Sequence, residues 1–218
     1  MLFNPKTTLF DMLLPRRCLV CKTDIVQGII CECCNSLCNP CPNPHISLKA
    51  GHHGALFYYE FTIKEIIKRA KFEKNVALTH LLLTLVEREL LKSDLLPQIQ
   101  KFSPCAITFV PAHWAKRLTH SIHLPLLFAQ ILSRTVQVPV VNILVKNKYN
   151  FTQSTLLKKS QRIIEVKGLF SPISDLKIYN KLILVDDIVT SGATFDEIGK
   201  IVHNLGSKLR CVAMAKTP

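Results

Sequence analysis

Two adjacent carboxylates followed by a short hydroxyl-rich loop form the part of this sequence best suited to chemistry. Asp186 and Asp187 follow the apolar run 182–185 and precede Thr190-Ser191-Gly192-Ala193-Thr194. Hydroxyl groups and unhindered backbone N–H groups at a helix N-terminus are the donors that hold a phosphate. The carboxylates would repel that phosphate, so we expect them to face hydroxyl groups or a divalent cation such as Mg²⁺. The spacing predicts a site for a sugar phosphate.

Two other interpretations of this segment are weaker. A single Asp at a strand end would be explained as a helix cap, because Asp, Ser and Thr are the usual capping residues. Two acids ahead of a Thr-Ser-Gly-Ala-Thr loop exceed what a cap requires. A nucleotide-hydrolysing site also needs a G-x-x-x-x-G-K-[ST] loop, and no such motif occurs among the seven glycines.

The cysteines favour a metal site near the N-terminus. The chain has nine cysteines, and most of them lie between Cys18 and Cys41. Four thiolates from two C-x-x-C pairs satisfy tetrahedral Zn²⁺. We expect structural zinc on the pairs with the longer intervening loop, which are Cys18, Cys21, Cys38 and Cys41. The pair Cys31 and Cys34, with Cys33 between them, is the alternative second half of the site.

The charge balance favours polyanionic partners. Lys and Arg total 28 against 15 acids, which gives a net charge of +13, and such an excess is typical of nucleic-acid binding as well as of plain solvated surfaces. The cations gather in two stretches, 64–74 and 146–167, and Tyr149 and Phe151 in the second could stack on bases. The candidate nucleic-acid contacts are Lys68, Lys71, Lys146, Lys148, Lys158, Lys159 and Arg162.

The chain length of 218 residues suits one ordinary domain with a small appendage. Prolines at 40, 42 and 44 indicate a linker, so we predict a zinc-binding module and linker over 1–54 and a larger domain over 55–218. In the larger domain, the pattern predicts strands at 55–61, 106–110, 138–144, 182–185 and 209–213, with helices at 64–70, 76–91, 126–133 and 194–205. Strands alternating with helices indicate an α/β fold with a mostly parallel sheet and helices on both faces.

The turn Val110-Pro111-Ala112-His113 is a candidate second anion site. It follows a predicted strand, and Lys116 and Arg117 come soon after. A strand simply ended by proline is an equally good interpretation. The histidines at 113, 120 and 123 fit no helical face, so we expect loop histidines rather than a metal set.

The acidic pair and its loop resemble the motif of type I phosphoribosyltransferases that binds 5-phosphoribosyl-1-pyrophosphate (PRPP). The resemblance implies that Asp186 and Asp187 meet the ribose hydroxyls with Mg²⁺, while the loop holds the 5-phosphate and the Val-Pro turn the pyrophosphate. The implied PRPP contacts are Asp186, Asp187, Ile188, Val189, Thr190, Ser191, Gly192, Ala193 and Thr194. The implied pyrophosphate loop contains Ala112, His113, Lys116 and Arg117.

The joint order of cysteine module, Ile67-Lys68-Arg69-Ala70-Lys71-Phe72, Val110-Pro111 and acidic-pair loop resembles the ComF family. The resemblance implies a zinc-ribbon-like module on a type I phosphoribosyltransferase-like domain, and a role in natural transformation that involves cytoplasmic single-stranded DNA. One departure is the stretch 120–124, which reads His-Ser-Ile-His-Leu where the family usually has R-G-F-N-Q. Three hypotheses follow: a DNA-uptake protein that binds single-stranded DNA and PRPP, an active phosphoribosyltransferase with an unidentified acceptor, and a structural partner of the uptake helicase.

No apolar run reaches the ~18 residues of a membrane span, and the N-terminal stretch lacks a signal-peptide pattern. We therefore expect a cytoplasmic protein, with peripheral association at the inner face of the inner membrane as a further option.

Overall fold

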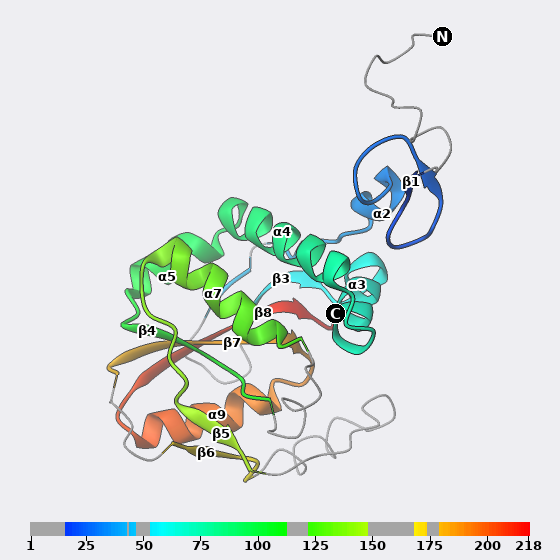
Figure 1. Cartoon of the computed structure of the whole chain (residues 1–218). Coiled ribbons are helices and arrows are strands. Elements are labelled where there is room, and N and C mark those ends of the chain that lie inside the picture. The colour runs from blue at the N-terminus through cyan, green and yellow to red at the C-terminus, as the bar shows by residue number, and fades with distance from the viewer. Residues whose placement is uncertain (1–15, 43, 47–52, 113–121, 148–167, 174–178) are drawn as a thin grey trace.

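A four-stranded parallel sheet forms the centre of the molecule (Figure 1), in the order β3-β8-β7-β4. The computed structural model describes residues 16–42, 44–46, 53–112, 122–147, 168–173 and 179–218. The strands are β3 (Gly54–Tyr58), β4 (Ala106–Phe109), β7 (Lys181–Val189) and β8 (Lys208–Lys216). All three neighbouring pairs are parallel, which confirms the predicted fold class.

Helices cover both faces of this sheet (Figure 1). One face carries α3 (Phe61–Phe72), α4 (Val76–Lys92), α5 (Leu95–Phe102) and α7 (Leu124–Val136), and the other carries α9 (Ala193–Asn204). Strand β7 shows why its apolar run is continuous. Ile183 and Val185 pack with the first group of helices, whereas Leu182 and Leu184 pack with α9. Because the strand is buried on both faces, apolar residues occupy successive positions instead of alternating with polar ones.

A second, two-stranded sheet lies beside α9. It pairs β5 (Leu144–Lys146) with β6 (Phe170–Pro172) antiparallel. The predicted strand 138–144 is wrong over most of its length. Val140 only forms an isolated bridge with Ile107 of β4, and the regular strand begins at Leu144, where the chain turns away to meet β6.

The N-terminal described segment forms a small module with its own short elements. They are β1 (Arg16–Arg17), β2 (Asp24–Ile25) and α2 (Glu32–Ser36), with β1 and β2 antiparallel. Leu19, Val20 and Ile30 of this module pack against the main core. The connection that follows is tied to the sheet by a bridge between Pro40 and Phe57. Among the described helices, none is long and apolar enough to cross a membrane.

Candidate functional site

The carboxyl ends of β4 and β7 bring the candidate residues together at one edge of the sheet, and we call this edge the crevice. β4 leaves the sheet early, because its last paired residue, Phe109, is level with Val185 of β7. β7 continues beyond that level, paired with β8 as far as Val189. The helix after β4 covers one face of the sheet and the helix after β7 covers the other. Parallel sheets bind ligands where the connections diverge in this way.

Asp186 and Asp187 lie inside β7 rather than beyond its end. Asp186 pairs in register with Ala213 of β8, and Ile188 and Val189 continue the strand. The prediction that the strand ends at residue 185 is therefore wrong, since pairing with β8 outlasts pairing with β4. Successive side chains of a strand point to opposite faces, so the two carboxylates lie on opposite faces of the sheet.

Asp187 is already matched by a cation. It is 5% exposed, and its Oδ2 lies 2.5 Å from the ammonium nitrogen of Lys71 on α3. Burial lowers the pKa of Lys71, but the charge of the Asp187 carboxylate outweighs it, and the pKa is raised above its ordinary value. Lys71 is thus held as a cation against Asp187.

Asp186, in contrast, lies in surroundings that disfavour its charged form. Its carboxylate accepts a hydrogen bond of 2.8 Å from the backbone N–H of Asp187. Burial, and then the neighbouring Asp187 carboxylate, raise the pKa of Asp186 to about 8, although Lys71 acts in the other direction. A carboxyl group with so high a pKa gains from a cation or hydroxyl donors that favour its ionised form.

The hydroxyl-rich loop leads directly into α9. Gly192 is the N-cap residue, with φ +78°, and the helix begins at Ala193. The first N–H groups of a helix have no partners within it, and they attract anions. The predicted contacts Thr190, Ser191 and Thr194 all keep solvent exposure there.

His53 is a residue of this site that the sequence analysis missed. A Cβ added to Gly192 would lie 2.5 Å from His53 Nε2. The imidazole packs edge-on against Phe195, with 4.8 Å between ring centroids, and its Nε2 lies 4.0 Å from Asp196 Oδ1. No local motif marks His53, because it precedes β3 and reaches α9 only through the fold.

The expected pyrophosphate loop is described only in part. Ala112 follows β4 at the crevice edge, and His113, Lys116 and Arg117 lie outside the described residues. His123 is described, and its Nε2 lies 3.1 Å from the carbonyl oxygen of Val110. The ring also packs edge-on against Phe109 of β4, with 5.4 Å between ring centroids.

For the metal-binding prediction, the structure favours the alternative second pair of cysteines. The four thiols that come together belong to Cys18, Cys21, Cys31 and Cys34, whose sulfur atoms lie within 4.8 Å of one another. Cys18 and Cys21 belong to the turn between β1 and β2. Cys31 is the N-cap of α2 and accepts from the Cys34 backbone N–H, so one helical turn brings that second pair together. Four thiolates at this spacing suit Zn²⁺.

Cys38 and Cys41 are not part of this cluster. Cys38 packs in the core beneath α3 and α4, and its thiol donates to the Cys34 carbonyl at 3.4 Å. Cys41 packs in the core beneath α9. Burial raises the pKa of each thiol to about 11. Both thiols are buried, and neither belongs to the four-cysteine cluster.

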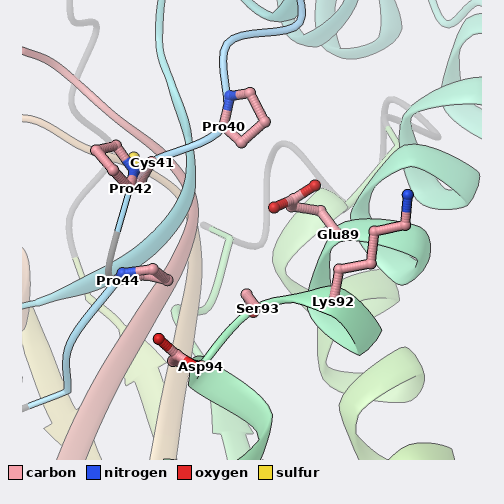
Figure 2. A pocket seen from close by; sticks show the side chains of 8 residues that line it. All are labelled: Pro40, Cys41, Pro42, Pro44, Glu89, Lys92, Ser93 and Asp94. Carbon is pink, nitrogen blue, oxygen red and sulfur yellow. The ribbon is translucent and has the colours of Figure 1, made fainter.

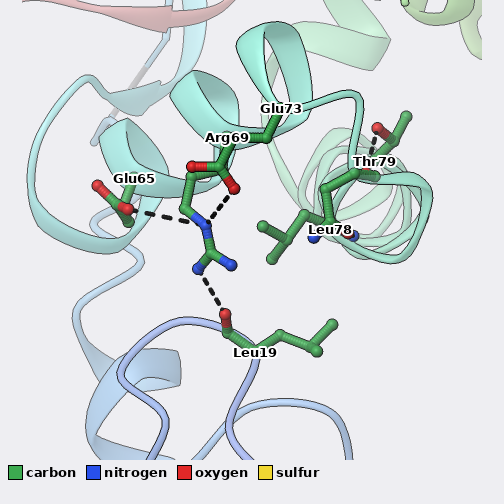
Figure 3. A network of polar contacts seen from close by, with 7 residues as sticks. Leu19, Glu65, Arg69, Glu73, Leu78 and Thr79 are labelled. Carbon is green, nitrogen blue, oxygen red and sulfur yellow. Dashed lines mark hydrogen bonds and ion pairs between the residues drawn. The ribbon is translucent and has the colours of Figure 1, made fainter.

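Arg69 joins the cysteine module to α3 (Figure 3). Its Nη1 donates a hydrogen bond of 2.7 Å to the carbonyl oxygen of Leu19, which lies between Cys18 and Cys21. Its Nε lies 3.1 Å from Glu73 Oε2 and 3.9 Å from Glu65 Oε1. Lys71, two residues further along α3, contacts Asp187, so one helix contacts both candidate sites.

The candidate nucleic-acid residues divide three ways. Lys68 is exposed on α3, Lys71 is engaged by Asp187, and Lys146 lies over the Phe170 ring at 5.9 Å. The ion pair makes Lys71 a poor candidate for a phosphate contact. Lys148, Lys158, Lys159 and Arg162 lie outside the described residues.

A pocket of about 430 Å³ lies where the linker passes α4 (Figure 2). Pro40, Pro42 and Pro44 line one side, and Glu89 and Asp94 lie on the other. Among the residues expected to bind metal or ligand, Cys41 alone lines it. This pocket is separate from the crevice and its acidic pair.

Comparisons with known proteins agree with this architecture. Residues 126–218 match the family model of the phosphoribosyl transferase domain. Competence protein F of Haemophilus influenzae is 30% identical over 152 residues, which make up 68% of this chain and 65% of that protein. The chain thus spans slightly less than two thirds of that relative's length.

Solved structures give weaker matches. The allosteric regulatory enzyme of purine biosynthesis is 15% identical, with a TM-score of 0.44 over 68% of this chain and 30% of that chain. Purine phosphoribosyltransferase from Pyrococcus horikoshii is 18% identical, with a TM-score of 0.36 over 66% of this chain and 76% of that chain.

The parallel sheet, its helices and the matched domain define a protein of the phosphoribosyltransferase fold. Within that class, the chain is ComF-like, because it is similar to Competence protein F.

Proposed function

We propose that this chain binds PRPP together with Mg²⁺ in the crevice between β4 and β7. Asp186 meets the ribose hydroxyls and the cation, and the loop from Thr190 to Thr194 holds the 5-phosphate at the start of α9. Ala112, with His113, Lys116 and Arg117, contributes to the pyrophosphate side. Lys71 holds the Asp187 side chain in place by their ion pair.

The observation that carries this proposal is that two different kinds of binding group lie at one edge of the sheet. The N-terminus of α9 offers backbone N–H groups beside a glycine with φ +78°, which suits a phosphate. Asp186, four residues before Thr190, has a pKa raised to about 8 by burial and by Asp187, so a divalent cation would favour its ionised form. A ligand with a phosphate at one end and a diol with bound Mg²⁺ at the other satisfies both.

Calorimetric titration of PRPP with Mg²⁺ tests the proposal. Wild-type protein should bind saturably, and Asp186→Asn should bind at least tenfold more weakly. Asp186→Asn is the sharper variant because Asp187→Asn would also remove the partner of Lys71. Asp94→Asn, which removes a carboxylate at the separate pocket, is the matched control. Absence of binding by folded wild-type protein would overturn the proposal.

Whether the bound PRPP reacts is a separate question with its own test. Transfer of phosphoribose releases pyrophosphate, and Mg²⁺ with cationic side chains would stabilise that leaving group. We propose binding as the retained function. Pyrophosphate release on addition of a nucleobase or another small acceptor would favour the active-transferase hypothesis instead.

A role in DNA uptake is the second part of the proposal. The relative from Haemophilus influenzae is named Competence protein F, and the net charge of +13 suits a polyanion. We place the chain in the cytoplasm, where it binds single-stranded DNA, with a zinc-loaded module over 1–54 and a PRPP-binding domain over 55–218. A protein that bound neither PRPP nor single strands would instead fit a structural partner of the uptake helicase.

Binding of single strands is tested by fluorescence anisotropy with a labelled oligothymidylate. Affinity should fall steeply between about 50 and 200 mM salt, because each neutralised phosphate releases counterions. An affinity that is independent of salt would contradict this part of the proposal.

A further inference from the structure

The exposed face of α3 carries an unusual pairing of side chains. Its opposite face is a normal apolar stripe, because Ile63, Ile66, Ile67 and Ala70 are fully buried. The exposed face would ordinarily hold only polar groups. Instead it begins with Phe61, which is 63% exposed, and ends with Phe72, which is 71% exposed.

These two phenylalanines stand apart from the other aromatic residues. In the part of the chain that the structure describes, they are the exposed large aromatic side chains, and the remaining exposed large hydrophobic residues are aliphatic. Single exposed apolar residues are common on protein surfaces. Here two exposed aromatic rings lie at the two ends of one helix, whereas every other described Phe is at least partly buried. We infer that the two rings contact the same ligand.

Two lysines lie between the rings. Lys64 and Lys68 are exposed, and with Phe61 and Phe72 they follow spacings of three, four and four residues, which keep side chains on one side of a helix. No ion-pair partner for Lys64 or Lys68 lies among the described residues. We call Phe61, Lys64, Lys68 and Phe72 the α3 stripe.

Three acidic residues lie close to the α3 stripe. Glu65 and Glu73 both form ion pairs with Arg69, at 3.9 Å and 3.1 Å, so the two carboxylates share one guanidinium. Glu60 is half-buried at the N-cap of α3. The stripe itself contains two lysines and no acidic residue.

We propose that the α3 stripe binds single-stranded nucleic acid. Bases stack on Phe61 and Phe72, and the phosphates between them contact Lys64 and Lys68. Aromatic platforms combined with cations that follow the backbone are the usual means of binding single strands. The eleven-residue separation of the rings along α3 corresponds to about 16 Å, or about five stacked nucleotides.

The inference rests on the proposed single-strand binding and gives it a surface. It also places that surface next to the PRPP crevice, because Phe72 follows Lys71, the partner of Asp187. The residues of the stripe differ from the sequence-based candidates. Phe61, Lys64 and Phe72 were not among them, and Lys71 is left out.

Fluorescence anisotropy with labelled oligothymidylate tests the stripe. Phe61→Ala and Phe72→Ala should each weaken binding about 5- to 150-fold, the range expected for loss of one stacked base. Leu91→Ala is the matched control, because Leu91 is 61% exposed on α4. The control should bind as wild type does.

The salt dependence of binding tests Lys64 and Lys68. Lys64→Gln combined with Lys68→Gln should lower the slope of log affinity against log salt by about 1.4, since each single-strand phosphate contact contributes about 0.7. Lys92→Gln with Lys101→Gln removes the same net charge from exposed positions on α4 and α5 and should change the slope little. Parallel titrations with oligouridylate separate a preference for DNA from one for RNA.

The outcomes separate the inference from the proposed function. If wild-type protein binds no oligonucleotide, single-strand binding itself fails. If wild type binds but the stripe variants match their controls, the surface assignment is overturned while the function stands. PRPP titration should be unchanged in Phe61→Ala and Phe72→Ala. A change in oligomeric state by light scattering, with unchanged oligonucleotide binding, would assign the stripe to a protein interface and overturn the inference.

Discussion

Lys71 on α3 and Asp187 on β7 form an ion pair with 2.5 Å between Nζ and Oδ2. The pair ties a surface helix to the central strand at the carboxyl edge of the sheet. It also distinguishes the two acidic residues. Asp187 has a cation of the protein as its partner, whereas Asp186 lies on the opposite face of the sheet. The two adjacent carboxylates therefore differ in their charged partners.

Lys71→Gln should lower the free energy of unfolding by about 1–3 kcal/mol. Breaking a fully buried pair costs about 3–5 kcal/mol, and the 36% exposure of the Lys71 side chain reduces that cost through solvent screening. Urea unfolding measures it. Lys68→Gln, an exposed neighbour, should change stability by less than about 0.5 kcal/mol. Equal effects of the two variants would contradict a structural role for the pair.

Asp186 should make ligand-free protein less stable as pH rises. Burial raises its folded-state pKa from 3.8 to about 8, so between these values the folded state holds a proton that the unfolded state has lost. Stability then decreases with increasing pH across this window. Lys71 titrates above it, because its pKa is raised from 10.5.

The measurement is the melting temperature of wild type and Asp186→Asn from pH 5 to pH 8. The asparagine variant lacks the titrating group. Its melting temperature minus that of wild type should therefore increase as pH rises. A constant difference across that range would show that Asp186 does not titrate there.

The sequence predicts the buried strand, the acidic pair and the loop because these are local patterns in one continuous segment. It does not predict Lys71 or His53 as parts of the site, since each reaches β7 or α9 only when distant elements pack. The choice between the two second cysteine pairs depends on the fold for a similar reason. The longer loop to Cys38 was plausible by spacing, but the N-cap geometry of α2 and the clustering of the sulfur atoms favour Cys31 and Cys34.

Gly192→Ala should abolish PRPP binding and lower stability. The residue has φ +78°, and its new Cβ would lie 2.5 Å from His53 Nε2. Gly199→Ala is the matched control within α9, where a Cβ meets nothing within 4 Å. The control should stabilise the protein by about 0.5–1 kcal/mol, because alanine is the better helix former. Calorimetry and thermal unfolding together check both, and normal PRPP binding by Gly192→Ala would exclude this loop as the phosphate site.

Metal analysis of cysteine variants checks the corrected cluster. Cys31→Ser and Cys34→Ser should lose zinc, because each removes one of four thiolates. Cys38→Ala and Cys41→Ala should retain one zinc per chain, although truncating buried thiols lowers their stability. Loss of zinc in Cys38→Ala with retention in Cys34→Ser would restore the original assignment.

Arg69→Met should weaken docking of the cysteine module on α3. It removes the charged donor to the Leu19 carbonyl, and hydrogen bonds to charged groups contribute about 1.5–3 kcal/mol. A zinc chelator should then shift the melting temperature less in Arg69→Met than in wild type, since the module no longer supports the larger domain. Arg88→Met, exposed on α4, should respond as wild type does. Identical chelator shifts in all three proteins would show that the contact carries no coupling.

Helix α3 is constrained in length as well as in sequence. One residue inserted before Arg69 would rotate everything after it by about 100° and advance it by about 1.5 Å. That single change would turn Arg69 away from Leu19 and Lys71 away from Asp187, and would expose part of the buried face. We therefore expect the fold to tolerate an inserted or deleted residue better in the segments that flank the helix, at 59–60 and 73–75, than within it.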